Sequence, residues 1–242
     1  MRVKVGEVES LCRYPVKSMS GELLDAADLG WHGLDGDRRL GFRRLNERGG
    51  FPWLTATKLP ELILFTPQRR DAALPGALPS HVRTPEGVEL PLFGAELAAD
   101  VGRRHGSRVE MIYLDRGIFD EAAVSIITST TVTEAAGLAA LPADARRFRP
   151  NIVIRSLRSV PYEEDEWVGG TLSVGEGSNS AAIAVTNRDE RCSMVNYHPD
   201  SGRPAPELLK AIVRVRDNKV GVYGTTIRRG HIAVGQSIFF EP

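Results

Sequence analysis

The stretch of the chain best suited to chemistry runs from Arg188 to Gly202 and places a cysteine among cationic residues. Cys192 directly follows Arg191, and a Pro-Asp-Ser-Gly turn sequence ends the stretch. A cation beside a thiol favours the thiolate, which is the form that attacks electrophiles or binds a soft metal. A small, buried, apolar cysteine is the more common environment for this residue and is the alternative. The stretch alone leaves both interpretations open.

Three further polar clusters combine cations with backbone that can approach a ligand closely. Lys17 and Ser18 follow a proline and offer an ammonium and a hydroxyl, both suited to phosphate oxygens. Arg38 ends a glycine-rich loop, and its guanidinium can hold an anion through two hydrogen bonds. The third cluster surrounds a Phe-x-Pro sequence and contains Arg146, Arg147, Arg149 and Asn151. An anion site is one interpretation of these clusters, and solvated or internally paired surface charge is the other.

Other common catalytic patterns are weak in this sequence. We find no glycine-lysine phosphate loop, no Gly-x-Gly-x-x-Gly motif after a strand and no paired cysteines or histidines at zinc spacing. His198 lies near Cys192, so a cysteine–histidine hydrolase is possible, but no oxyanion hole is evident. The acidic run Glu163–Glu166 is interpreted as a solvated turn.

Composition favours a soluble, cytoplasmic globular protein. The chain has 242 residues, with 31 Lys and Arg against 31 Asp and Glu, and therefore no formal net charge. This balance argues against general affinity for nucleic acid or anionic membranes. The two cysteines, Cys12 and Cys192, are too few for a disulfide framework, which favours a reducing compartment. The first residues lack the apolar run of a signal peptide, and no apolar run is long enough to span a bilayer.

The pattern along the chain predicts mainly short strands with a few helices. A hairpin is expected over Val82–Leu90, and helices are expected over Gly94–Gly102, over Thr130–Ala139 and from about Pro206 onwards. The first half is typical of a small barrel or sandwich. A shift in composition near residues 115–122 predicts two domains, residues 1–115 and residues 116–242.

Taken together and in this order, the polar clusters resemble the MOSC proteins, which are relatives of the C-terminal domain of molybdenum cofactor sulfurase. The segments that carry the resemblance are Tyr14–Ser18, Gly36–Arg38, Arg147–Ile154, Glu164–Trp167, Arg191–Cys192 and Pro199–Gly202. The resemblance covers nearly the whole chain. Within the family, the sequence is most similar to the amidoxime-reducing component and its bacterial homologues. The resemblance implies a β-barrel-type N-terminal domain packed on a MOSC β-barrel domain.

The resemblance also implies a molybdenum cofactor site between the two domains. In that site the Cys192 thiolate would be the protein ligand to molybdenum, since a soft metal prefers a soft donor. Lys17, Ser18 and Arg38 would hold the cofactor phosphate and pterin, while Arg149 and Asn151 would position the pterin or the oxo-metal end. We expect the three cations of this set to converge on one cleft.

Two positions depart from the family pattern. The reductases of the family often have Cys-x-x-Cys at the metal loop, and here the first position is Asp189. His198 stands where an aspartate is usual. The sequence also lacks the Cys-x4-Cys-x2-Cys spacing of a plant-type ferredoxin, so electrons are expected from a separate ferredoxin-, flavodoxin- or cytochrome-type protein.

Three functions are therefore considered. The leading hypothesis is a molybdenum-dependent oxidoreductase that reduces small N-hydroxylated compounds. The second is a carrier of the cofactor, or of a sulfur atom on Cys192, without turnover of its own. The third is a β-barrel scaffold with no cofactor.

Overall fold

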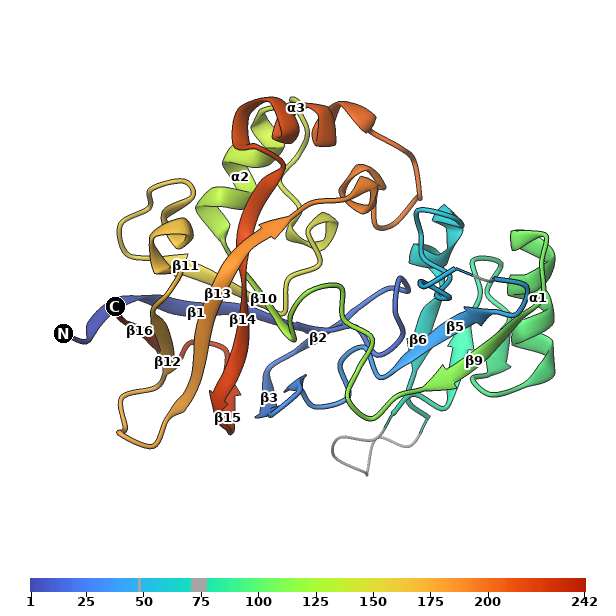
Figure 1. The fold of residues 1–242 in the computed structure, drawn as a ribbon, viewed down its shortest axis with the longest axis horizontal. Coiled ribbons are helices and arrows are strands. Elements are labelled where there is room, and N and C mark those ends of the chain that lie inside the picture. The colour runs from blue at the N-terminus through green and yellow to red at the C-terminus, as the bar shows by residue number, and fades with distance from the viewer. Residues whose placement is uncertain (48, 71–77) are drawn as a thin grey trace.

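The main body of the protein is a closed β-barrel (Figure 1), seen in a computed structural model that describes residues 1–47, 49–70 and 78–242. Among these residues, seven strands follow one another in the order β11-β10-β14-β13-β12-β16-β1, and the pairing of β1 with β11 closes the barrel. Strands β10 and β11 run parallel, and the other neighbours run antiparallel. The barrel strands are β1 (Val3–Arg13), β10 (Val124–Thr128), β11 (Ile152–Ser156), β12 (Thr171–Val174), β13 (Ala181–Glu190), β14 (Lys219–Arg228) and β16 (Ser237–Glu241).

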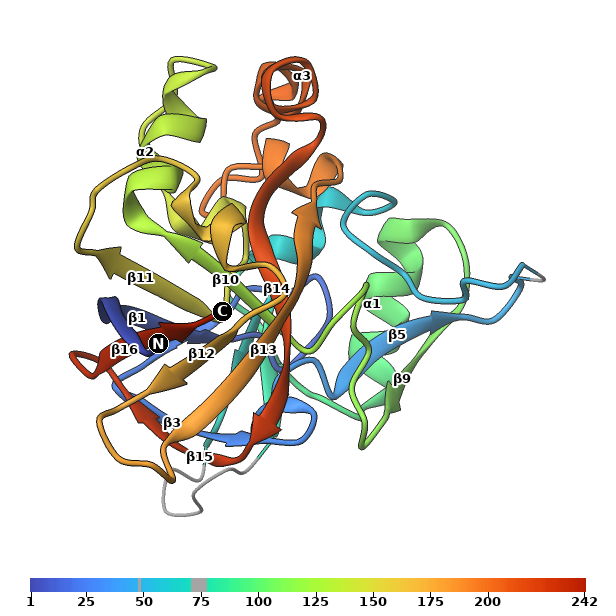
Figure 2. The same cartoon turned by 60° about the vertical axis from the view of Figure 1, so that its left-hand side comes forward.

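Strand alternation explains how the barrel packs on both of its faces. In β10, Val124 and Ile126 belong to the core inside the barrel, while Ile127 belongs to a second core. Successive side chains of a strand point to opposite faces, so the apolar residues of β10 serve both cores. The outer core lies beneath α2 (Ser129–Gly137) and α3 (Pro206–Arg216), which sit together above the barrel in the turned view of Figure 2.

Beside the barrel lies a second lobe built from the N-terminal half of the chain (Figure 1). It has its own apolar core, which includes Phe42, Phe65, Leu97 and Val101. Its elements are β5 (Leu40–Arg44), η1 (Pro60–Leu64), β6 (Thr66–Gln68), β7 (His81–Arg83), β8 (Glu89–Pro91), α1 (Ala95–His105) and β9 (Val109–Tyr113). The remaining short elements are β2 (Glu22–Leu24), β3 (Ala26–Gly30), β4 (Gly33–Leu34), η2 (Ala145–Arg147), η3 (Glu163–Trp167), η4 (Ser193–Asn196) and β15 (Gly230–Ala233).

The three predicted helices and the predicted hairpin are confirmed. Helix α2 begins after Thr128, whose hydroxyl accepts a hydrogen bond from the Thr131 N–H at 3.1 Å, and α3 begins at Pro206. Helix α1 ends where Gly106 adopts a φ of +77°, and β7 and β8 form the hairpin. These α-helices have 11, 9 and 11 residues, and no helix in the described ranges is long and apolar enough to cross a membrane.

The predicted fold class, mainly β with a few helices, is confirmed. The barrel takes strands from both ends of the chain, because β1 pairs with β11 and β16. Strand β3 likewise pairs with β15. The predicted division at residue 115 stays a prediction. The chain crosses between lobe and barrel near this residue, between β9 and β10.

The prediction of a solvated turn at Glu163–Glu166 is wrong for Glu163 and Glu164, although Glu166 is exposed. Glu163 is 2 % exposed and Glu164 is fully buried. Glu164 accepts hydrogen bonds from the hydroxyls of Thr128 (3.1 Å) and Thr131 (2.8 Å), which lie at the start of α2. A buried carboxylate is tolerated where hydroxyl and amide donors replace its water shell. The donors come from a distant segment, so the acidic run alone did not reveal them.

Candidate functional site

Lys17 is held at the junction of the barrel and the lobe. Its backbone N–H donates to the Leu40 carbonyl at 2.7 Å, and its side chain is 6 % exposed. The ammonium donates to the Ile118 carbonyl (3.1 Å) and to Asp120 Oδ1 (2.7 Å). Burial lowers the pKa of Lys17, and the Asp120 carboxylate opposes this effect. An ammonium has three donors, so one N–H remains for a ligand.

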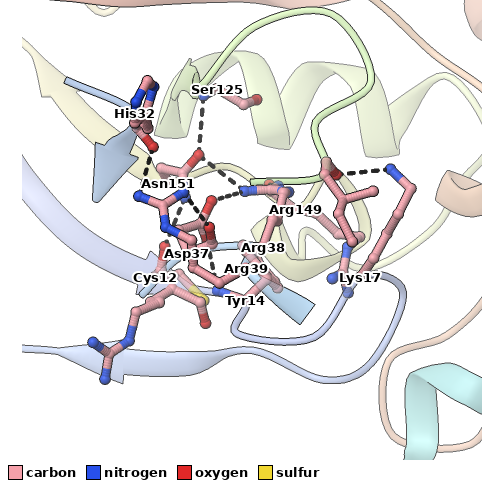
Figure 3. A network of polar contacts seen from close by, with 12 residues as sticks. Cys12, Tyr14, Lys17, His32, Asp37, Arg38, Arg39, Ser125, Arg149 and Asn151 are labelled. Atoms are coloured by element: carbon pink, nitrogen blue, oxygen red, sulfur yellow. Dashed lines mark hydrogen bonds and ion pairs between the residues drawn. The ribbon is translucent and has the colours of Figure 1, made fainter. Parts of the chain in front are cut away.

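Arg38 is fixed by a buried polar network, which Figure 3 displays. Asp37 is fully buried, and its carboxylate accepts hydrogen bonds from the Tyr14 N–H at 2.7 Å and from Arg38. The Arg38 guanidinium also donates to Asn151 Oδ1 (3.2 Å) and to the Arg149 carbonyl (3.1 Å). The network therefore joins the glycine-rich loop to the segment before β11.

Arg149 is the least satisfied cation of the group. It donates through Nη1 to the Met19 carbonyl at 2.7 Å, while its Nη2 is buried without a hydrogen-bond partner among the described residues. Its guanidinium lies 4.1 Å from the centre of the Tyr14 ring, and that of Arg38 lies 4.8 Å from the same ring. Burial lowers the pKa of Arg149. A buried donor without a partner is costly, and an anionic ligand would supply the missing acceptor.

Three residues of the site have left-handed backbone conformations. The φ angles of Ser18, Arg38 and Arg149 are +68°, +50° and +52°. Residues with a Cβ atom rarely adopt this region, because it costs free energy that the surrounding contacts must offset. Such strain gathers at functional sites. The three positions come from separate segments, and the site is built where those segments meet.

Cys192 lies at the start of η4 and is exposed, whereas Cys12 is buried. The interpretation of a buried apolar cysteine is therefore wrong for Cys192. The neighbouring Arg191 donates to the carbonyls of Val220 and Phe148, both at 2.7 Å, and pairs with Asp189 at 2.9 Å. These contacts anchor the residue before Cys192 to β14 and to the segment before β11, which places the thiol at a defined point.

Asp189 stands three positions before Cys192 in the sequence, and its side chain is buried. One of its carboxylate oxygens takes part in two interactions. Its Oδ2 accepts a hydrogen bond from Ser125 Oγ at 2.8 Å and faces Arg191 at 2.9 Å. Its Oδ1 is buried with no hydrogen-bond partner among the described residues. Burial raises the pKa of Asp189 to about 6 against the attraction of Arg191. The Asp189 carboxyl therefore keeps its proton to a higher pH than a solvated aspartate does.

These residues line one cavity of about 320 Å³ between the barrel and the lobe. Five of the six predicted site residues contribute to its wall: Lys17, Ser18, Arg38, Arg149 and Cys192. The expected convergence of the three cations Lys17, Arg38 and Arg149 is thus seen in the geometry. What these residues bind stays a prediction, because geometry alone does not identify an occupant.

Asn151 reaches the site indirectly. Within the described residues it is not part of the cavity wall, and it is 1 % exposed. Its Oδ1 accepts hydrogen bonds from Arg38 and from the Ser125 N–H (3.1 Å), and its Nδ2 donates to the Cys12 carbonyl at 3.2 Å. The geometry gives Asn151 the role of positioning Arg38. Its predicted contact with a pterin stays a prediction.

Arg147 also contributes to the cavity wall, whereas Arg146 and His198 are not among its lining residues in the described part of the chain. Arg146 is exposed and pairs with Asp144 (2.8 Å) and Asp200 (2.7 Å). His198 accepts a hydrogen bond from the Asp200 N–H at 3.2 Å, and among the described residues no hydrogen bond joins it to Cys192. The cysteine–histidine pairing of a hydrolase is therefore not formed in this structure.

Several residues of the cavity wall were not among the site residues predicted from the sequence. They include Asp120, Ser125, Asp189, Arg191 and Tyr223. Burial raises the pKa of Tyr223, so its hydroxyl stays protonated as a donor. The sequence held a usable signal for Asp189 and Arg191, which stand within three residues of Cys192. It held none for Asp120 or Tyr223, which pairing and packing bring to the cavity.

Comparison with known proteins identifies the family. The model of the MOSC domain matches residues 102–239, and that of the MOSC N-terminal beta barrel domain matches residues 5–96. The molybdenum cofactor sulfurase of Oryza sativa subsp. japonica is 46 % identical over 81 residues, which are 33 % of this chain and 9 % of that protein. The chain thus spans less than a tenth of this curated relative.

The fold of this chain is also found in a solved structure. The crystal structure of the YuaD protein from Bacillus subtilis has a TM-score of 0.53 and 16 % identity, covering 99 % of this chain and 97 % of that one. YiiM from Geobacillus stearothermophilus has a TM-score of 0.38 and 20 % identity, covering 50 % of this chain and 54 % of that one. MOSC domain proteins bind the molybdenum cofactor or act in its sulfuration. With one model matching over half of its length and a second matching the residues before it, the chain belongs to the MOSC domain family.

Proposed function

We propose that this protein is a molybdenum-cofactor-dependent oxidoreductase that reduces small N-hydroxylated compounds with electrons from a separate redox protein. The observation that carries the proposal is one cavity lined both by an exposed thiol, Cys192, and by the cations Lys17, Arg38 and Arg149. An organic anion that carries a soft metal requires these two features together.

The residues of the cavity fit this cofactor. The remaining N–H of Lys17 is a donor suited to phosphate oxygens, and Ser18 adds a hydroxyl. Arg38, held in place by Asp37 and Asn151, presents a fixed guanidinium. Cys192 would supply the thiolate ligand. When bound, the cofactor supplies two-electron redox chemistry at the metal, and the protein supplies orientation and charge.

The proposed reaction also needs protons. Reduction of an amidoxime to an amidine breaks the N–O bond, consumes two electrons and two protons, and releases water. Asp189 lines the same cavity, and burial raises its pKa to about 6, so its carboxyl can hold a proton there near neutral pH. The proposal assigns the electrons to a separate redox protein of the ferredoxin, flavodoxin or cytochrome type.

A second candidate function has one specific observation in its favour. The curated relative is named for the sulfuration of the molybdenum cofactor and is 46 % identical over 81 residues. This second candidate is a carrier of sulfur or of the cofactor. Cys192 would carry a sulfur atom, or the cavity would hold the cofactor for transfer, and the protein would not turn over a substrate of its own.

The test separates the two functions. Wild type, Cys192→Ser, Lys17→Gln and the control Ser193→Ala would be expressed in cells that make molybdopterin. Molybdenum content, pterin content and reduction of benzamidoxime with an artificial electron donor would then be measured. We expect Cys192→Ser to lose turnover but keep most of its pterin, Lys17→Gln to lose pterin, and Ser193→Ala to match wild type.

Each contrary outcome has a clear meaning. Full reductase activity in Cys192→Ser would refute the ligand assignment. Wild-type protein that contains the cofactor but does not reduce benzamidoxime or other N-hydroxylated compounds would favour the carrier function. Wild-type protein with neither molybdenum nor pterin would leave a barrel scaffold and overturn both proposals.

A further inference from the structure

A second cavity of about 470 Å³ shares Arg149 with the wall of the proposed cofactor cavity. It is formed between the N-terminal lobe and the barrel by residues near β2, η1, β7, η2 and η4. The two cavities share the wall residues Arg147, Arg149 and Met194. Lys17, Arg38 and Cys192 line only the first cavity, whereas Ser20 and Arg83 line only the second. The separate wall residues allow the two cavities to be tested independently.

The second cavity carries positive charge that the protein does not compensate. Four arginines line it, and the single acidic residue of its wall, Asp200, is occupied by Arg146. The other three, Arg83, Arg147 and Arg149, have no carboxylate within ion-pairing distance among the described residues. Burial lowers the pKa of both Arg147 and Arg149. An uncompensated set of guanidinium groups in one cavity favours an anion.

Two donors of this cavity are buried and unused. Arg149 Nη2 and Ser20 Oγ have no hydrogen-bond partner among the described residues. Ser20 is held in position because its backbone N–H donates to the Phe65 carbonyl at 3.0 Å. Buried polar atoms in native proteins nearly always have partners, so two unused donors in one cavity indicate an acceptor that is not part of the chain.

Part of the remaining wall is apolar. Leu23, Ile63, Leu64 and Met194 line the cavity together with the arginines. A free inorganic anion would leave this surface without a partner, whereas an organic molecule would cover it and gain free energy from the burial. The occupant is therefore expected to combine an anionic head with an apolar body.

We propose that this second cavity is a binding site for a small organic anion, with a phosphate or carboxylate head held by Arg83, Arg149 and Ser20. The site is distinct from the proposed cofactor cavity and does not depend on its occupant. Arg149 is its link to that cavity, since the same buried guanidinium lies in both walls.

The experiment is calorimetric titration of the protein, purified from cells that make molybdopterin, with phenyl phosphate, benzoate and inorganic phosphate. We expect phenyl phosphate or benzoate to bind saturably, and the better of the two identifies the head group. Inorganic phosphate should bind about tenfold more weakly than phenyl phosphate, because it cannot cover the apolar wall. Binding should weaken as the salt concentration rises.

Variants locate the site. Arg83→Gln and Ser20→Ala should each weaken binding by roughly fivefold. The first variant removes a charge that is in contact with solvent, and the second removes one neutral hydrogen bond. The charge-matched control is Arg214→Gln on α3, whose side chain is exposed, and it should bind like wild type. Lys17→Gln, which alters only the cofactor cavity, should also leave the affinity unchanged within about twofold.

Three results would overturn the proposal. The first is a lack of saturable binding of all three probes. The second is binding that falls in Lys17→Gln but not in Arg83→Gln or Ser20→Ala, which would place the anion in the cofactor cavity. The third is loss of pterin from Arg83→Gln and Ser20→Ala, which would make the second cavity an extension of the cofactor site. Neither absent reductase activity nor absent molybdenum bears on these outcomes.

Discussion

The role assigned to Asn151 gives a prediction whose size follows from its contacts. Its Oδ1 is the acceptor for the Ser125 N–H at 3.1 Å and for Arg38 at 3.2 Å, and its Nδ2 is a donor to the Cys12 carbonyl at 3.2 Å. The side chain is 1 % exposed, so Asn151→Ala removes one interaction from each of these groups where water is excluded. We therefore expect the variant to be strongly destabilised.

The magnitude can be worked out group by group. Arg38 keeps Asp37 and the Arg149 carbonyl, so its loss is small. The Ser125 N–H and the Cys12 carbonyl each lose an interaction in a buried setting, at about 1–3 kcal/mol apiece. A loss of about 3 kcal/mol in the free energy of unfolding corresponds to roughly 6–12 °C in the thermal midpoint for a chain of this size.

The assay is urea and thermal unfolding of the cofactor-free protein, followed by circular dichroism. Asn179→Ala is the matched control, because Asn179 is exposed and should change stability by less than about 0.5 kcal/mol. A loss below about 1 kcal/mol in Asn151→Ala would refute the reasoning, since it would mean that water or a shift of the backbone satisfies the freed groups.

Three further predictions concern the cysteines and the buried carboxylates. A thiol reagent should modify the exposed Cys192 in the native protein and modify Cys12 only after unfolding, because Cys12 is 8 % exposed and burial raises its pKa to about 11; two fast-reacting thiols in native protein would contradict this. The folded-state pKa of Asp189 is raised from 3.8 to about 6, so the native protein holds the proton longer than the unfolded chain, and stability should fall as the pH rises from about 4 to 6. Asp189→Asn should remove this part of the slope, and an unchanged pH profile would count against the raised pKa. Glu164→Ala should cost about 2–4 kcal/mol in urea unfolding by leaving the hydroxyls of Thr128 and Thr131 without their acceptor, whereas the exposed control Glu176→Ala should cost less than about 0.5 kcal/mol.

Local sequence patterns were sufficient for the elements and for most of the site. Periodicity predicted the helix over Thr130–Ala139, which forms as Ser129–Gly137, because apolar spacing and a capping hydroxyl act within a few residues. The short motifs around Lys17, Arg38, Arg149 and Cys192 identified residues that meet in one cavity. Their types can be read locally, since an anion needs cations and a soft metal needs a thiol.

Only the tertiary structure decided which residues meet and which charges are buried. The closure of the barrel depends on β1 pairing with β11, and the two strands are far apart in the chain. Asn151 became a support for Arg38 because its partners come from three segments, and Glu164 is buried because α2 supplies its donors. A polar residue leaves water only where the fold provides compensating donors or acceptors. Those partners are distant in sequence, so no local pattern contains them.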